Sequence, residues 1–442
     1  MTAADGQRAS AQGPGQERAS VRGRASPVLG AAGRLLPASI PLRFFGAAVL
    51  FHLLAWLALG AGAGQWPAYP SAMGWPLAAL HLLTLGVLGM SAIGASAQLL
   101  PVATRQAAPS QRLLGALWWL YSAGVALLAL GMGLVRPALL GAGALALVLG
   151  LLLWAGLIAR NLRGARGMRA VVAHGWLALA ALALLLASAL ALAASWNGLP
   201  TLSRNAMLAL HLAFGPYGFM GLLSLGLSYI LVPMFAVSDV PGERAQLASA
   251  GLILAALVLA ALAAIGLAPM LLRVAALLLA AAGVGLHLHL MTSTLRSGMR
   301  RALGRSFTLV RIGWSGLAAS LALALGLVLQ VPIPRLGSWF GLCLIGVWLL
   351  SFLLGMLQRI LPFLAAMHAS HGQRARTPSA LTHEGALRVH FVCHLVALAL
   401  LGLAIGTDSA VVVTAASVVG SAGALAFGVF YGVVLYRLRR PA

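Results

Sequence analysis

Histidines are the side chains of this chain that can do chemistry, because their surroundings are almost entirely apolar. Eight of the eleven lie in long apolar stretches: His52, His81, His174, His211, His287, His289, His390 and His394. No Asp, Glu or Lys occurs in those stretches, so histidine is the only group there that titrates near neutral pH. An imidazole in hydrocarbon is costly unless it is hydrogen-bonded, faces water or binds a metal. The histidines are therefore either hydrogen-bonded packing residues or ligands.

His81 and His211 are the first candidates for ligands, since they occupy matching places in two similar segments. Each opens an apolar segment and is followed by glycines, Gly215, Gly218 and Gly221 in the second case. A three-residue spacing places such glycines on one helix face, which admits either a flat ring or another helix. The first alternative predicts a haem with a histidine as axial ligand and the macrocycle along the glycines. The second alternative is close helix packing.

Two further groupings are weaker candidates. His390 and His394 are four residues apart, so they share a helix face as a chelating pair would. His287 and His289 are two apart, which sends their rings to opposite faces, so they cannot share one metal. We expect cofactor ligation by His81 and His211, with His390 and His394 as outside candidates, and no disulfide between Cys343 and Cys393.

The composition predicts which elements must carry these residues. Of 442 residues, 61% are hydrophobic and 8% are charged, and the mean hydropathy is +0.98. Continuous apolar runs of this kind indicate an all-α polytopic membrane protein and exclude a β-barrel. The formal charge of +23 comes from arginines in short loops and in the N-terminal segment, so it indicates topology and not nucleic-acid binding.

Twelve spans are predicted. They fall near 42–63, 78–100, 113–133, 138–159, 171–195, 206–234, 247–267, 270–294, 307–329, 340–363, 386–405 and 410–436. Spans 2, 6 and 10 close on Pro101, Pro233 and Pro362, about 130 residues apart, which indicates three repeated groups of four spans. The repeats run over approximately 40–160, 170–295 and 306–437. Residues 1–38 are predicted to form a disordered, arginine-rich cytoplasmic tail before the transmembrane domain at 39–442.

Arginines predict the orientation. Outer loops and outer helix ends hold only Arg136, Arg204, Arg273 and Arg335, and the other loops are rich in arginine. This asymmetry predicts that both termini lie in the cytoplasm.

Twelve spans with a histidine opening span 2 resemble subunit I of the haem–copper oxidases. The strings His81-Leu-Leu-Thr-Leu-Gly86 to Pro101, Gly226 to Phe235 and Ile40 to Phe45 are similar to those of uncharacterised bacterial relatives of that fold. The NnrS family of haem- and copper-containing nitric-oxide-stress proteins is a further neighbour. The resemblance covers residues 40–437 and implies a haem–copper oxidase subunit I-like fold, with His81 in the place of the low-spin haem ligand.

The chain departs from the oxidases at the reaction centre. His211 matches a copper-ligating histidine, but Gly215 stands where a tyrosine should follow, and Tyr217 comes later. Spans 7 and 10 lack the paired histidines that should ligate copper and haem. The resemblance therefore implies a retained scaffold with haem b, with copper as a second candidate, and argues against an oxygen-reducing proton pump.

The expected function is haem binding in the inner membrane, with a role in nitric oxide or respiratory stress or in electron transfer. Its expected partners are the lipid bilayer and respiratory-chain subunits or a redox partner, without nucleic acid. The alternative is a cofactor-free permease or an assembly factor for a respiratory complex on the same scaffold, and transport of an unknown hydrophobic substrate also stays open.

Overall fold

A computed structural model describes residues 34–66, 72–300, 302–369 and 376–439 of the chain. Among these residues every regular element is a helix, and twelve helices are long and apolar enough to span a membrane. The predicted all-α class and the twelve spans are therefore confirmed, and the predicted ends lie within about four residues of the observed ones, except that span 10 continues to Ala369, six residues past its predicted end. Most of the predicted tail, residues 1–33, lies outside the described part.

The spans are built as follows. In chain order they are α1 (Ser39–Ala61); α2 (Trp75–His81), η3 (Leu82–Gly89) and α3 (Met90–Ala103); α4 (Gln111–Gly133); α5 (Pro137–Arg163); α6 (Arg169–Trp196); α7 (Arg204–Leu212), η4 (Ala213–Gly221) and α8 (Leu222–Ala236); α9 (Glu243–Ala264); α10 (Pro269–Ser297); α11 (Gly304–Val328); α12 (Leu336–Gly341), η5 (Leu342–Leu350) and α13 (Ser351–Ala369); α15 (Glu384–Thr407); and α16 (Ala410–Arg439). Short connecting elements are η2 (Ala63–Gln65) and α14 (Pro378–Leu381).

The three spans that repeat in sequence share an unusual backbone. In each of them a π-helical segment, η3, η4 or η5, joins two α-helical pieces, and a proline lies inside the second piece. A π-helix has i→i+5 hydrogen bonds and often marks a functional site. The three segments that are similar in sequence therefore also share a backbone feature, and the three groups of four spans stay a prediction.

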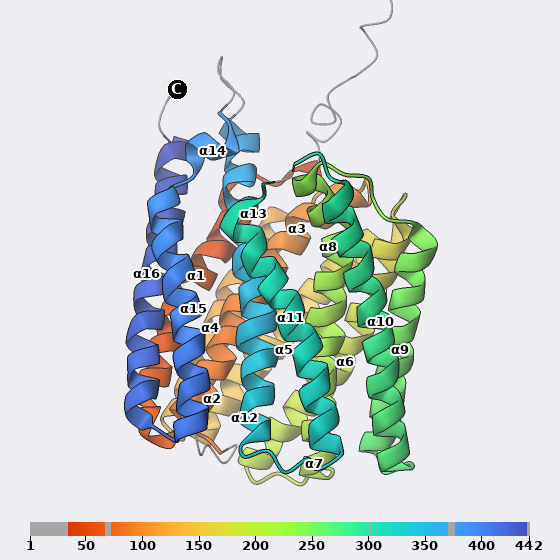
Figure 1. Ribbon diagram of the computed structural model, residues 1–442, viewed down its shortest axis with the longest axis vertical. Helices are drawn as coiled ribbons and strands as arrows, with labels where there is room; N and C mark the ends of the chain where they lie inside the picture. Colours follow the sequence, from red (N-terminus) through yellow and green to blue (C-terminus); the bar gives the residue numbers. More distant parts are fainter. Residues whose placement is uncertain (1–33, 67–71, 301, 370–375, 440–442) are drawn as a thin grey trace, which may run out of the picture.

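The same three spans form the centre of the molecule. They are 67%, 78% and 67% buried over their most apolar windows, against 22–50% for the other nine. Segment η5 contacts both η3 and η4, and α1 lies beside α16, so the first and last spans are neighbours in the bundle (Figure 1). Other helices surround these three spans, which explains why they are rich in glycine and apolar on all faces.

The two ends of the bundle differ in charge. The end where α1 begins and α16 finishes, at the top of Figure 1, carries most of the arginines; we call it the arginine-rich end. Arg136, Arg204, Arg273 and Arg335 all lie at the starts of helices at the opposite end. Among the described residues, two acidic side chains near helix ends form ion pairs, Glu384 with Arg305 and Asp408 with Arg335.

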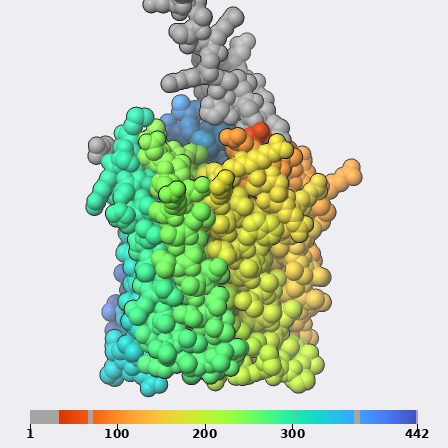
Figure 2. Space-filling model, turned by 90° about the vertical axis from the view of Figure 1, so that its right-hand side faces the viewer, coloured from red at the N-terminus to blue at the C-terminus, as the bar shows by residue number. Residues whose placement is uncertain are grey.

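The sides of the bundle are apolar. Figure 2 shows the face formed by helices from the middle of the chain, where α5, α6, α9 and α10 are exposed. Leu145, Leu149 and Leu152 on α5 are each at least half exposed, as are Leu271 and Leu278 on α10. Such surfaces suit lipid, as is typical of a multi-pass membrane protein.

Candidate functional site

His81 and His211 lie side by side at the end of the bundle opposite to the arginine-rich end. His81 is the last residue of α2, directly before η3, and His211 is the second-last residue of α7, one residue before η4. Their ring centroids are 6.4 Å apart with the planes tilted by 35°. The matching places that the two residues occupy in the repeats thus become a contact between spans 2 and 6. In the third repeat Gly341 precedes η5, and no histidine lies there.

The hydrogen bonds of this pair leave nitrogen atoms available. Nδ1 of His81 lies 3.0 Å from the carbonyl oxygen of Leu77, which can only accept, so this nitrogen carries the proton and Nε2 carries the lone pair. Nδ1 of His211 is buried and has no hydrogen-bond partner among the described residues. Metal-ligating histidines characteristically donate one ring N–H to a carbonyl and ligate through the other nitrogen.

The spacing of the two rings suits a shared metal. An ion held between two imidazole nitrogens at about 2.0–2.1 Å from each keeps the ring centroids about 6 Å apart. The pair could therefore supply two imidazole donors to a haem iron or to a copper ion.

Neighbouring side chains cover the helix faces formed by the glycines. These faces therefore do not provide the flat surface for a macrocycle that the sequence suggested. A Cβ at Gly86 would lie 2.6 Å from Cβ of Phe51, and a Cβ at Gly89 would lie 2.2 Å from the hydroxyl of Tyr121. At Gly218 the methyl group of Ala181 fills the space, 2.9 Å from the added atom. Moreover η4 is π-helical, so residues three apart do not stay on one face. Close helix packing explains these glycines.

His390 and His394 belong to a second cluster. Their rings stack with centroids 5.8 Å apart, as the four-residue spacing predicts, and His52 of α1 lies 6.3 Å from His390. All three side chains are at most 2% exposed. Sequence reasoning did not join His52 to this group, because His52 is on the first span and His390 is on the eleventh.

Each member of the second cluster has a protein partner. Nε2 of His52 accepts from the indole of Trp56 at 3.1 Å, Nδ1 of His390 donates to Gly423 O at 3.0 Å, and Nε2 of His394 lies 2.8 Å from Oγ of Ser351. Nε2 of His390 is the buried nitrogen without a partner among the described residues. These contacts describe a hydrogen-bonded polar layer, separate from the pair of His81 and His211.

A third cluster was not predicted. His174 on α6 and His287 on α10 both pack edge-on against Tyr229 of α8, with ring centroids 5.5 and 5.0 Å apart. All three residues are fully buried. The one available signal was that His287 and His289 point to opposite faces, and indeed His287 is buried and His289 is exposed.

The remaining predicted groups have structural partners. His368, expected in a loop, is instead in the last turn of α13, because that helix continues to Ala369; its two nitrogens bond Leu364 O and Leu36 O. Arg359 bonds Oγ of Ser306 and the carbonyl of Leu303. Cys343 and Cys393 are both free. His371 lies outside the described residues, and His383 caps α15.

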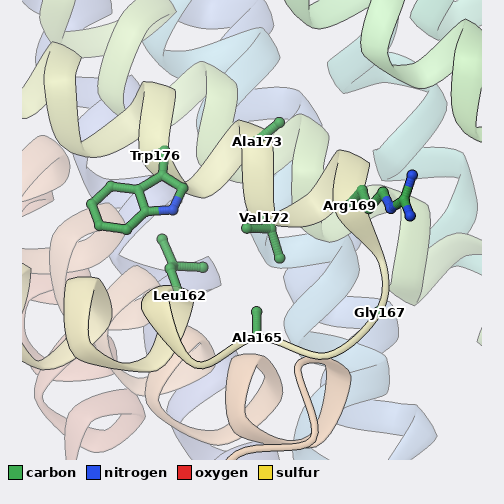
Figure 3. A pocket seen from close by; sticks show the side chains of 7 residues that line it. All are labelled: Leu162, Ala165, Gly167, Arg169, Val172, Ala173 and Trp176. Carbon is green, nitrogen blue, oxygen red and sulfur yellow. The ribbon is translucent and has the colours of Figure 1, made fainter.

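Two cavities lie apart from these clusters. One, of about 450 Å³, is lined mainly by aliphatic side chains of spans 6 to 10 and by the stacked rings of Tyr217 and Trp348. The other, of about 410 Å³, is an open pocket between α5 and α6 at the arginine-rich end (Figure 3), where Trp176 and Arg169 flank Leu162 and Val172. Histidine lines neither of them.

Within the described part of the chain, no three side chains of His, Cys, Asp or Glu are grouped to hold a metal ion. The metal-binding chemistry that these histidines support is therefore that of imidazole pairs. No protein-family model matches the chain, and no curated protein matches it either.

Proposed function

We propose that this chain is a haem-binding protein of the bacterial inner membrane, with His81 and His211 as ligands and copper as the second candidate for the same pair. Its role is in electron transfer or in nitric oxide and respiratory stress. The observation that carries the proposal is the approach of the two imidazoles to 6.4 Å at the start of two π-helical segments. Bound there, a haem supplies one-electron chemistry.

The protein contributes ligands and their orientation. The carbonyl of Leu77 fixes the tautomer of His81 and holds its ring, which leaves Nε2 as the donor atom. The π-helical segments that follow both histidines are buried between neighbouring helices, so the two ligands are held by rigid elements of the centre. Those features support the proposal; the resemblance to the haem–copper oxidases and the NnrS family supports the role.

Oxygen reduction coupled to proton pumping is not proposed. Such a pump needs groups that change charge at membrane depth, and the sequence places no carboxylate or lysine inside a span. Span 7, formed by α9, contains no histidine, and span 10 has none before His368 at its end. The second metal of an oxidase therefore lacks its ligands.

The test is a visible spectrum of the detergent-purified protein, made with ample haem supply, oxidised and then reduced with dithionite. We expect a Soret band and sharp reduced α and β bands. His81→Ala and His211→Ala should each lower haem per chain at least several-fold, and His289→Ala, which removes an exposed imidazole, should not. A colourless wild type, or full haem content in both variants, would overturn the assignment. Metal analysis of the same samples separates copper from haem.

A second function is favoured by one observation, the apolar cavity of about 450 Å³ between spans 6 and 10. A cavity of this size with a mainly aliphatic lining suits a permease for a hydrophobic molecule on a scaffold without a cofactor. Co-purification of a lipophilic compound with a metal-free protein would support it. Co-purification of an oxidase or reductase subunit would instead support an assembly factor.

A further inference from the structure

Two imidazoles in the second group of helices have a buried nitrogen with no protein partner. Helices α6, α8, α9 and α10 pack around one another, and His174, Tyr229 and His287 lie between them, each with no measurable exposure. Among the described residues, neither Nε2 of His174 nor Nε2 of His287 has a hydrogen-bond partner. A buried polar atom without a hydrogen-bond partner is costly, so two such nitrogens on either side of contacts with Tyr229 call for a ligand.

The tautomer of His174 is fixed by the backbone. Its Nδ1 lies 2.7 Å from the carbonyl oxygen of Ala170, which can only accept a hydrogen bond. Nδ1 therefore carries the proton, and Nε2 presents a lone pair. The ring is also held in place, because Gly226 on α8 allows a close approach in which an added Cβ would lie 2.7 Å from Cβ of His174.

His287 has the same arrangement with a hydroxyl in place of the carbonyl. Its Nδ1 lies 2.9 Å from the hydroxyl of Tyr229, which can accept as well as donate. With Nδ1–H donating to that oxygen, Nε2 of His287 is a second lone-pair donor. One nitrogen anchored by an oxygen and the other free is the arrangement that orients histidine ligands in metal sites.

The surroundings of the two free nitrogens favour an ion of low charge. Both donors are neutral, and the carboxylates of the described spans, Glu243 and Glu384, are exposed at the first residues of α9 and α15, so no carboxylate is buried in this core to balance a charge. The cost of transferring an ion into a low-dielectric interior rises with the square of its charge, so a monovalent ion costs far less here than a divalent one. Met291, fully buried and one turn from His287 on the same face of α10, adds a soft thioether.

We infer that His174 and His287 bind a monovalent copper ion in the core of the α6, α8, α9 and α10 bundle. The site is independent of the one proposed at His81 and His211. It uses other helices, and His174 is near the start of α6 at the arginine-rich end, whereas His81 and His211 are at the opposite end. Bundle cores of facing helices are a common place for such sites.

The experiment uses the full chain carrying His81→Ala and His211→Ala, so that the other pair cannot contribute. The metal-free, ascorbate-reduced protein is titrated with Cu⁺ in competition with bicinchoninate. We expect one Cu⁺ per chain, with Zn²⁺ binding weaker by roughly tenfold or more because of its double charge. Adding His174→Ala or His287→Ala should abolish this binding, and adding His289→Ala, two residues away on the exposed face, should leave it unchanged.

X-ray absorption at the copper edge, measured on the parent protein with His81→Ala and His211→Ala, tests the ligands of the copper ion even if the added variants misfold. Two imidazole nitrogens in the nearest shell are expected. Copper retained in full by both the His174 and His287 variants, a copper shell without imidazole, or no Cu⁺ binding by the folded parent would each overturn the inference. Loss of haem at His81 and His211 has no bearing on any of these outcomes.

Discussion

The indole N–H of Trp56 donates a hydrogen bond to Nε2 of His52, 3.1 Å away and one turn earlier on α1. Because an indole nitrogen can only donate, this contact fixes His52 with its proton on Nδ1 and occupies its lone pair. His52 is therefore a structural member of the cluster with His390 and His394. The contact also explains how a mainly apolar helix tolerates an imidazole that is 2% exposed.

Replacing Trp56 by Phe should destabilise the protein. The substitution leaves Nε2 of His52 buried without a donor and removes ring volume that fills the space at Gly420, where an added Cβ would lie 2.2 Å from the indole. The expected loss is about 1–3 kcal/mol, seen as a lower midpoint of thermal unfolding in detergent. Trp119→Phe is the matched control, since Trp119 is 69% exposed. Equal midpoints for the two variants would contradict this role.

The sequence was sufficient to predict the spans, and the three repeated groups of four spans stay a prediction. Long apolar runs, arginine-rich loops and three prolines about 130 residues apart in Pro101, Pro233 and Pro362 follow from local rules, and the twelve helices agree with them. The pairing of His390 with His394 also followed, because two residues four apart on a helix must share a face.

The contacts between helices could not be predicted in the same way. His174 meets Tyr229 and His287 because α6, α8 and α10 are neighbours in the bundle, and apolar helices carry no signal for which faces meet. The interpretation of the glycines as a surface for a flat ring was wrong for a related reason. A glycine spacing shows that a face is smooth, but only the packed structure shows that Phe51 and Tyr121 fill the faces at Gly86 and Gly89.

Glycines at close helix crossings should tolerate no side chain. At Gly131 on α4 an added Cβ would lie 2.3 Å from the backbone nitrogen of Leu140 on α5, and backbone cannot move aside cheaply. Gly131→Ala should therefore lower the thermal midpoint, by an amount equivalent to about 1–3 kcal/mol. Gly156→Ala on α5 is the control: nothing lies within 4 Å of its Cβ, so the higher helix propensity of Ala should leave stability equal or raised. A destabilisation by Gly156→Ala as large as that by Gly131→Ala would refute the packing argument.

The arginine-rich end should face the cytoplasm. Fusion of a reporter that is active only in the cytoplasm should give signal after Arg437, and fusion after Asn197 in the loop between α6 and α7 should not. A reporter active only in the periplasm should give the reverse pattern. Periplasmic activity at the C-terminal fusion would reverse the orientation, and with it the side of the membrane to which His81 and His211 are close.

A substitution of Arg359 can distinguish a structural role of this residue from a role in haem binding. Its guanidinium donates through Nε to Oγ of Ser306 at 2.8 Å and through Nη2 to the carbonyl of Leu303, so it ties α13 to the start of α11 at the arginine-rich end. Lysine has one compact ammonium group and cannot span both acceptors in this geometry. Arg359→Lys should therefore lower the thermal midpoint, by an amount equivalent to about 1–2 kcal/mol, because hydrogen bonds from a charged donor are lost. Arg311→Lys, at an exposed position of α11, should not change it.

Haem content measured on the same Arg359→Lys samples tests the other interpretation, that this arginine pairs with a haem propionate. His81 and His211 are at the opposite end of the bundle from Arg359, so haem per folded chain should be the same as in the wild type. A loss of haem with an unchanged midpoint would show that Arg359 contacts the cofactor, and the haem would then have to lie nearer the arginine-rich end than His81 and His211 allow.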